Sequence, residues 1–374
     1  MLPYGHQSID DSDVAAVGAA LRSDWLTTGP QVDAFEAELA EWTGGTPCTV
    51  VTSGTAALHV AYAAAGVGPG DEVIATPMTF VATASCASVL GATIVFADVE
   101  EDTANLDPAA VSAAITPRTR VIAAVDFAGH PAEYDNLNPI AETAGALVVA
   151  DAAHAIGSTY RGRPVGSLAD LTTLSFFPTK NMTTAEGGAV VARDPELLRR
   201  ARTFKTIGLV RDRERMRYPD EGGWHQEVHE FGVNYRLPDL LCALGRNQLR
   251  RLASFKARRA RLTARYHELL AGVPGLRLPT QREYVDPAWH LFPARILDGR
   301  RREVYEKMRA AGIGVQVNYI PSYWHPVYED LGYRRGMCPN AEAFYAEELS
   351  LPMYADLTDD DQDRVVETLI KILD

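Results

Sequence analysis

Lysine is scarce in this chain of 374 residues, which has five lysines against thirty-one arginines. Positive charge as a whole is also in deficit, because 36 lysines and arginines oppose 49 aspartates and glutamates and leave a net charge of −13. A nucleic-acid-binding protein is expected to present a basic face, so this balance argues against that class. If the ligand is an anion, the positive charge that binds it must be local, from arginines, helix N-termini or a buried lysine.

Cysteines and long apolar runs are also few. The four cysteines (Cys48, Cys86, Cys242 and Cys338) show neither paired nor metal-type spacing, so we expect reduced thiols in a cytoplasmic protein and no metal site. No stretch of about 18 uninterrupted apolar residues exists, which argues against a membrane span. The first fourteen residues lack a basic region and an apolar run, so we expect no signal peptide.

The first half of the chain alternates short apolar, β-branched runs with segments of helical spacing. Strand-like runs lie at 48–53, 69–77, 93–99, 120–127, 146–151 and 171–177, and helix-like segments at 54–67 and 79–92. Buried strands separated by helices predict right-handed crossovers and a mostly parallel sheet covered on both faces. The fold class predicted is therefore α/β.

The pattern changes after about residue 245. Residues 246–272 predict one long amphipathic helix, whose many arginines are most simply a solvated face. A shorter strand at 290–297 and a final helix, capped by Thr358 or Asp359, follow it. We therefore predict two domains, a large ligand-binding domain over 1–245 and a small α+β domain over 246–374.

Three features fall at the carboxyl ends of predicted strands, where open α/β sheets bind ligands. Ser53, Gly54 and Thr55 stand between a strand and a helix start, where free N–H groups attract a phosphate; an ordinary capped helix is the alternative. Asp151 ends a buried strand, and an acid there needs a cation unless it caps a helix. Lys180 follows the strand 171–177, and the alternative is a solvated loop lysine.

Together, a phosphate cradle, a buried acid and a lysine in this order fit pyridoxal 5′-phosphate. The acid would keep the pyridine nitrogen protonated, and the lysine would form a Schiff base with the cofactor. A guanidinium stays protonated and is a poor nucleophile, whereas burial can lower the pKa of a lysine amine. This difference explains why a chain that favours arginine uses lysine at position 180.

Six segments resemble one known family: "VVTSGTAALHVA", "TPMTFVATA", "VVADAAHAIGS", "LSFFPTKNMTTAEGGAVV", "GVNYRLPDLLCALGRNQL" and "SLPMYADLTDDDQDRVV". They are similar to the DegT/DnrJ/EryC1/StrS family of fold-type I, pyridoxal-phosphate-dependent aminotransferases, which act mainly on nucleotide-linked keto-sugars. The resemblance covers nearly the whole chain, in family order. It implies a large cofactor-binding domain followed by a smaller C-terminal one.

The resemblance also implies roles for individual residues. Lys180 would bind the cofactor covalently and Asp151 would pair with its ring nitrogen. His154 stands where the family places a residue near the cofactor's phenolic oxygen, although a satisfied core histidine is the alternative. The other cofactor contacts implied are Gly54, Thr55 and Ser175 at the phosphate, Phe80 stacked on the ring, and Asn234 reaching the phosphate across a homodimer interface.

The branch of the family is indicated by further segments. Related dehydratases replace the lysine with histidine, so Lys180 favours transamination. The segment "TTAEGG" (183–188) resembles branches that aminate sugar C4, where "TTGEGG" is usual, and Ala185 departs from that pattern. Residues 318–333 resemble the substrate-side segment of those enzymes, so Glu186, Trp324 and His325 are expected to bind substrate. For Trp324 and His325 the alternative is a surface turn before Pro326.

These features predict an enzyme that transfers an amino group from L-glutamate to C4 of a nucleotide-linked 4-keto-6-deoxy sugar, as a homodimer with shared active sites. Two alternatives stay open at this point. The substrate could be a C3-keto sugar or a cyclitol ketone. The chain could also be a non-catalytic regulator that only senses a ligand of the pyridoxal phosphate pocket. No nucleic-acid or membrane partner is expected.

Overall fold

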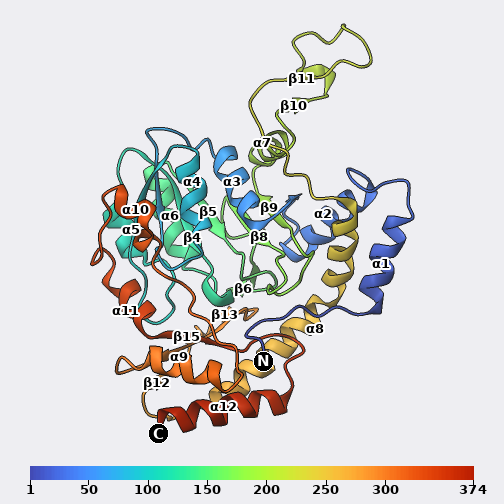
Figure 1. Ribbon diagram of the computed structural model, residues 1–374. Coiled ribbons are helices and arrows are strands. Elements are labelled where there is room, and N and C mark those ends of the chain that lie inside the picture. Colours follow the sequence, from blue (N-terminus) through green and yellow to red (C-terminus); the bar gives the residue numbers. More distant parts are fainter.

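A seven-stranded sheet forms the centre of the larger part of the computed structural model, which describes residues 1–374 (Figure 1). Its strand order is β1-β9-β8-β5-β4-β2-β3. The strands are β1 (Cys48–Val51), β2 (Glu72–Ala75), β3 (Thr93–Phe96), β4 (Thr119–Val125), β5 (Leu147–Asp151), β8 (Leu171–Ser175) and β9 (Gly188–Ala192). Only β9 runs opposite to the other six strands, so the predicted mostly parallel sheet is confirmed.

Strand β9 is the part of the sheet that the strand-helix alternation did not predict. It follows β8 without an intervening helix, which an antiparallel pair permits because no crossover is needed. The connection between Ser175 and Gly188 carries Lys180. The lysine therefore lies in a loop that is anchored at both ends by paired strands.

Both faces of the sheet are buried, as predicted. Along β4, Val121 and Ala123 belong to one apolar cluster of 40 buried residues, whereas Ile122 and Ala124 belong to a second cluster of 34. This alternation is the period-2 geometry of a strand covered on two sides. The helices packed around the sheet are α2 (Pro30–Trp42), α3 (Gly54–Ala64), α4 (Ala82–Val89), α5 (Pro108–Ala114), α6 (Tyr134–Ala144) and α7 (Pro195–Lys205).

The C-terminal part contains a second, antiparallel sheet of three strands, with a third apolar cluster of 18 buried residues. Its elements are β12 (Leu276–Arg277), β14 (Phe292–Ile296), β15 (Glu348–Leu351), α9 (Arg301–Ala310) and α12 (Asp359–Leu373). Of the two candidate caps, Thr358 caps α12, because its hydroxyl accepts a hydrogen bond from the Asp361 N–H at 3.1 Å.

The long helix α8 (Asp239–Leu269) begins before the predicted residue 246 and joins the two parts of the molecule as one continuous helix (Figure 1). The predicted boundary near residue 245 falls inside it, and the division into two domains stays a prediction. Residues 319–345 return to the large sheet, where Tyr323 and Tyr328 enter the first apolar cluster. This segment contains η3 (Ser322–Trp324) and α10 (Pro326–Asp330) and ends within α11 (Pro339–Glu347).

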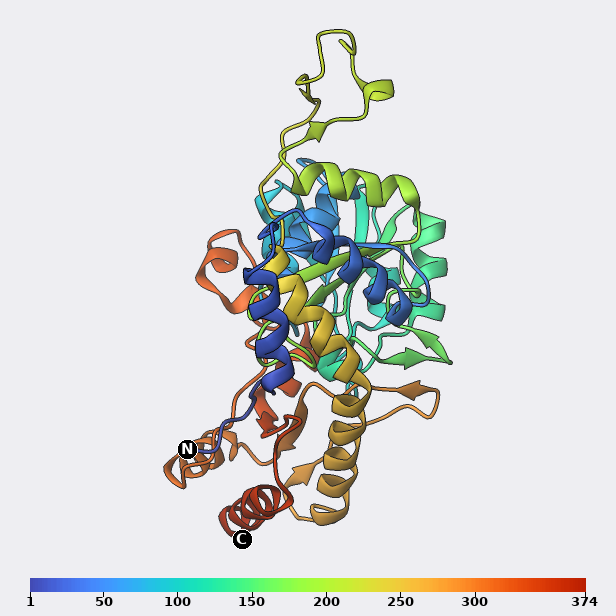
Figure 2. The ribbon, with the colours of Figure 1, turned by 90° about the vertical axis from the view of Figure 1, so that its right-hand side faces the viewer.

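One hairpin, β10 (Leu209–Val210) with β11 (Glu227–Val228), extends far from the body of the molecule (Figures 1 and 2). We call residues 208–231 the arm. Two of its large apolar side chains are almost wholly exposed, Trp224 at 84% and Phe231 at 98%. The sequence patterns did not predict the arm.

The remaining elements lie outside the large sheet. They are α1 (Asp11–Leu21), η1 (Phe127–Gly129), η2 (Arg213–Arg215), and a small sheet of β6 (Thr159–Tyr160), β7 (Arg163–Pro164) and β13 (Val285–Asp286). None of the helices combines the length and the apolar character that a membrane crossing requires. No cluster of metal-ligating side chains is present.

Candidate functional site

The three features predicted to bind a ligand meet at one edge of the large sheet. Asp151 ends β5 and Lys180 follows β8, the parallel strand that pairs directly with β5. Strand β1, which leads into Ser53 and Gly54, points the same way as β8, because both are antiparallel to β9. The carboxyl ends of all three strands therefore share an edge, the position where α/β sheets bind ligands.

The turn from β1 into α3 forms a tight cradle. The Ser53 hydroxyl caps α3 by accepting a hydrogen bond from the Ala56 N–H at 3.0 Å. A Cβ atom on Gly54 would lie 2.7 Å from the Cβ of Ser175, so only glycine permits this approach. Thr55 is exposed on the first turn of α3. The geometry brings Gly54, Thr55 and Ser175 to a helix N-terminus, where a phosphate is favoured.

Asp151 is a buried acid whose side chain is fixed by two donors. Its carboxylate accepts hydrogen bonds from the Thr83 hydroxyl at 2.6 Å and from the Ala153 N–H at 3.2 Å. Burial raises the pKa of Asp151, whereas these two hydrogen bonds and the charge of Lys180 lower it. Thr83 was not among the predicted site residues, although it lies in the segment "TPMTFVATA".

Lys180 has the properties of a reactive amine. Burial lowers the pKa of its amine to about 8, and the charge of Asp151 opposes this shift. At pH 7 a pKa near 8 leaves roughly one amine in ten neutral, far more than the ordinary lysine pKa would allow. Lys205, in contrast, already donates to the Val50 carbonyl at 2.7 Å and to Glu36 at 3.4 Å.

His154 is buried and both of its ring nitrogens have neighbours. Nδ1 accepts a hydrogen bond from the Ala128 N–H at 3.3 Å, so Nε2 carries the proton and lies 3.1 Å from the Tyr319 hydroxyl. Burial lowers the pKa of His154 well below its ordinary value, and the charge of Lys180 adds to this. The imidazole is therefore neutral at pH 7. Its contact with the cofactor stays a prediction.

Tyr319 is a site residue that was not predicted from the sequence. It lies in the segment 318–333, which was assigned to the substrate side. The available signal was its hydroxyl, because a buried tyrosine usually needs a hydrogen-bond partner. Its ring centroid lies 6.2 Å from that of Phe80, which is 57% exposed. Tyr319 thus lies between two predicted cofactor contacts, with its ring near Phe80 and its hydroxyl near His154.

The remaining predicted residues lie on other segments. Glu186 and Asn234 are exposed, and the Tyr235 carbonyl beside Asn234 accepts a hydrogen bond from the Thr52 N–H at 3.1 Å. The Trp324 indole N–H lies 3.3 Å from a Glu342 carboxylate oxygen, with the Arg335 guanidinium 4.1 Å from its ring centroid. His325 precedes α10 and is half-buried. The roles of Glu186, Asn234, Trp324 and His325 stay predictions.

Ala185 adopts a left-handed backbone with φ of +66°, at the position where the C4-aminating branches usually have glycine. This conformation costs an L-residue about 1 kcal/mol, so we expect Ala185→Gly to raise the free energy of unfolding by about 0.5–1 kcal/mol. Urea unfolding would measure the change. Ala189→Gly, in the buried strand β9, is the matched control and should destabilise the protein. A less stable Ala185→Gly variant would show that the backbone at residue 185 is not strained.

The residues at this edge fit pyridoxal 5′-phosphate. A cradle that a single Cβ would fill suits a phosphate, the buried Asp151 suits a protonated ring nitrogen, and the amine of Lys180 suits the aldehyde carbon. Each of these three groups of the cofactor thus has a partner of the right chemistry within the chain.

Comparisons with known proteins agree with this fit. Two relatives match along this whole chain: the spore coat polysaccharide biosynthesis protein SpsC of Bacillus subtilis (38% identity, 97% of the relative covered) and the UDP-4-amino-4,6-dideoxy-N-acetyl-beta-L-altrosamine transaminase of Campylobacter jejuni (37%, 98% covered). Among solved structures, the putative sugar aminotransferase Spr1654 of Streptococcus pneumoniae in its PMP form has a TM-score of 0.94 at 31% identity, with 100% of this chain and 99% of that chain covered.

That neighbour has also been solved in a PLP form, with a TM-score of 0.93. Helicobacter pylori PseC, an aminotransferase involved in the biosynthesis of pseudoaminic acid, gives a TM-score of 0.92 at 29% identity over 100% of this chain and 99% of its own. These likenesses confirm the predicted fold class, the α/β fold of pyridoxal-phosphate-dependent sugar aminotransferases. Residues 7–370 match the description "DegT/DnrJ/EryC1/StrS aminotransferase family", and the chain belongs to that family.

Proposed function

We propose that this sugar aminotransferase moves an amino group from L-glutamate to the C4 keto group of a nucleotide-linked 4-keto-6-deoxy sugar. One observation supports amination at C4: a relative 37% identical over the whole chain is named as the transaminase of a UDP-4-amino-4,6-dideoxy sugar. The segment "TTAEGG" supports the same position through its likeness to C4-aminating branches.

Two residues of the chain serve this reaction in the proposal, Lys180 as the base and Asp151 as the partner of the ring nitrogen. The cofactor, when bound, supplies an electron sink for the substrate carbanion. Lys180, with a pKa of about 8, is suited to take a proton from the donor's Cα and return it one step later. Asp151 would hold the proton on the ring nitrogen, a role supported by the two hydrogen bonds that fix its carboxylate. A protonated ring makes the sink effective.

The position of amination is tested with a panel of keto-sugars. We expect the purified enzyme with glutamate to aminate nucleotide-linked 4-keto sugars at least about tenfold faster than 3-keto isomers, because a site that positions one carbonyl leaves the other out of reach. Mass spectrometry of the products measures this ratio. Faster amination of 3-keto isomers or of a cyclitol ketone would contradict the C4 assignment, and failure with every amine donor would favour the non-catalytic regulator.

We also propose a homodimer in which each site borrows Asn234 from its neighbour. The exposed Asn234 follows the arm, whose exposed Trp224 and Phe231 suit a protein interface. In a two-fold dimer, a Lys180→Ala subunit paired with an Asn234→Ala subunit has one doubly defective site and one intact site.

Mixing these two variants should therefore restore activity to at most about half of wild type per mixed dimer. Each variant alone is the control and should be impaired. If the subunits exchange and no activity returns, Asn234 acts within its own chain and the shared site is wrong.

The thiols support a cytoplasmic location, which we propose as well. All four cysteines are free and buried, and unpaired thiols are typical of reducing compartments. Burial raises the pKa of the Cys86 and Cys338 thiols to about 12, so these groups stay protonated and unreactive at neutral pH. Both side chains belong to the first apolar cluster.

A further inference from the structure

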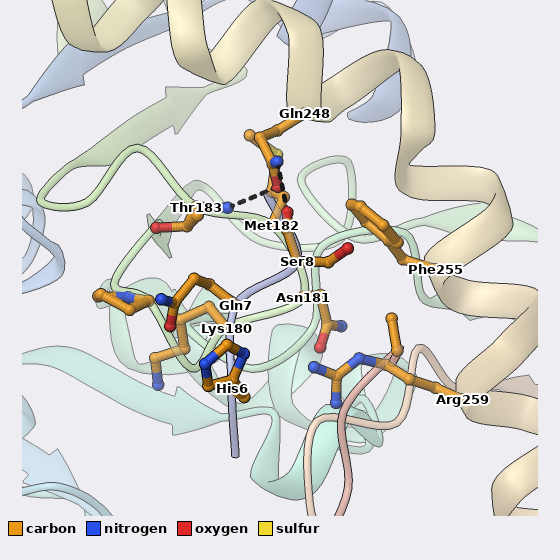
Figure 3. A pocket seen from close by; sticks show the side chains of 12 residues that line it. His6, Gln7, Ser8, Lys180, Asn181, Met182, Thr183, Gln248, Phe255 and Arg259 are labelled. Carbon is orange, nitrogen blue, oxygen red and sulfur yellow. Dashed lines mark hydrogen bonds between the residues drawn. The ribbon is translucent and has the colours of Figure 1, made fainter. Parts of the chain in front are cut away.

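A small pocket lies behind Lys180, between the N-terminal segment, the Lys180 loop and α8 (Figure 3). Its volume of about 10 Å³ has room for one water-sized sphere. Two polar atoms at this pocket have no hydrogen-bond partner, the carboxamide oxygen Oδ1 of Asn181 and the guanidinium Nε of Arg259. The two side chains are 6% and 2% exposed, so bulk water reaches neither atom freely.

The orientation of both groups is fixed by their other contacts. Arg259 Nη1 faces the carbonyl oxygens of Trp289, His290 and Met353 at 3.1–3.3 Å. Burial lowers the pKa of Arg259 to about 10, which leaves it charged at pH 7. Asn181 Nδ2 donates to the Ala288 carbonyl at 2.6 Å, so its oxygen is the end that faces the Arg259 guanidinium in Figure 3.

The chemistry of the two free atoms selects the occupant. Arg259 Nε–H needs an acceptor, and Asn181 Oδ1 needs a donor. A chloride ion accepts hydrogen bonds but cannot donate one to Asn181, whereas a water molecule does both. Leaving either buried group unpaired would destabilise the fold, and a polar gap of this size commonly holds water.

We propose that one buried water bridges Arg259 Nε and Asn181 Oδ1 and thereby ties the Lys180 loop to α8. Asn181 is the chain neighbour of Lys180, and Lys180 itself lines the pocket. Asn181 already donates a hydrogen bond to the Ala288 carbonyl. The water would add a link from Asn181 to Arg259 on α8, a helix that also packs against α12 in the C-terminal part. Asn181 and Arg259 are in this account positioning residues for the lysine.

A crystal structure of the cofactor-bound enzyme at about 1.5 Å resolution tests the water directly. We expect a density peak within about 2.7–3.2 Å of both Arg259 Nε and Asn181 Oδ1. A second crystal soaked in sodium bromide separates an anion from water, because bromide scatters anomalously. An empty pocket, or an anomalous bromide peak at this position, would overturn the proposal.

The positioning effect is tested with two variants that both lose the Asn181 amide donor. Asn181→Asp keeps an acceptor for the water, whereas Asn181→Leu does not. The readout is the absorbance titration of the cofactor linked to Lys180, and we expect the Leu variant to shift its midpoint about half a pH unit further than the Asp variant does. Asn138→Leu, which removes an amide bonded to the Leu168 carbonyl, is the control. Equal midpoints in the two Asn181 variants would show that the water does not position Lys180. If the Leu variant fails to fold, the electron density of the wild-type crystal still decides whether the water is present.

Discussion

Lys180→Arg is expected to lower transamination by about ten-thousandfold or more. Arginine keeps the charge and most of the volume, but its guanidinium stays protonated and cannot bond covalently to the cofactor. A positioned general base alone contributes roughly 10²–10⁴-fold, and the covalent link is lost in addition. Steady-state assays with saturating donor and keto-sugar measure the loss.

Lys307→Arg is the matched control, because Lys307 lies in a surface ion pair with Glu303 on α9. Its activity should equal that of wild type. If Lys180→Arg retained more than about one per cent of wild-type activity, a group other than Lys180 would be the base, since a positioned base contributes at least that factor.

Asp151→Asn is expected to keep the cofactor but to lose about ten- to 150-fold in turnover. A neutral amide cannot hold a proton on the ring nitrogen, and losing a charge-assisted hydrogen bond costs about 1.5–3 kcal/mol. Cofactor binding should persist, because the cradle of Gly54 and Ser175 and the amine of Lys180 are unchanged. The absorbance of the purified protein checks binding, and kcat checks turnover.

Thr83→Val provides a graded comparison, because Thr83 fixes the Asp151 carboxylate without carrying its charge. We expect a smaller loss for Thr83→Val than for Asp151→Asn. Near-normal turnover in Asp151→Asn would show that another residue contacts the ring nitrogen.

The parallel part of the sheet could be predicted because each strand is a short apolar run bounded by a helix or turn. Strand β9 was harder, since its residues "GAVVA" follow the Lys180 loop without a helical segment to mark the change. The start of α8 was placed too late because the arginine-rich stretch after residue 245 dominated the pattern, whereas the helix begins at Asp239.

Some residues of the candidate site could likewise be predicted from the sequence, and others could not. Asp151 ends one buried strand and Lys180 lies in the loop after the neighbouring strand, so their positions at one sheet edge could be predicted from the sequence. Tyr319 comes from a segment far along the chain, and its contact with His154 depends on how residues 319–345 return to the large sheet. The pocket of Asn181 and Arg259 joins residues 78 positions apart, and no periodicity or motif links them.

The central claim is that Lys180 carries the cofactor, and borohydride reduction followed by peptide mass spectrometry tests it most directly. Reduction should fix the link between lysine and cofactor, and the yellow protein should lose its colour. Lys205 is the instructive competitor, because it is a buried lysine whose amine donates a hydrogen bond to the Val50 carbonyl in β1. We predict the cofactor mass on the peptide that contains Lys180 and none on the peptide that contains Lys205; label on Lys205, or on no lysine peptide, would contradict the account.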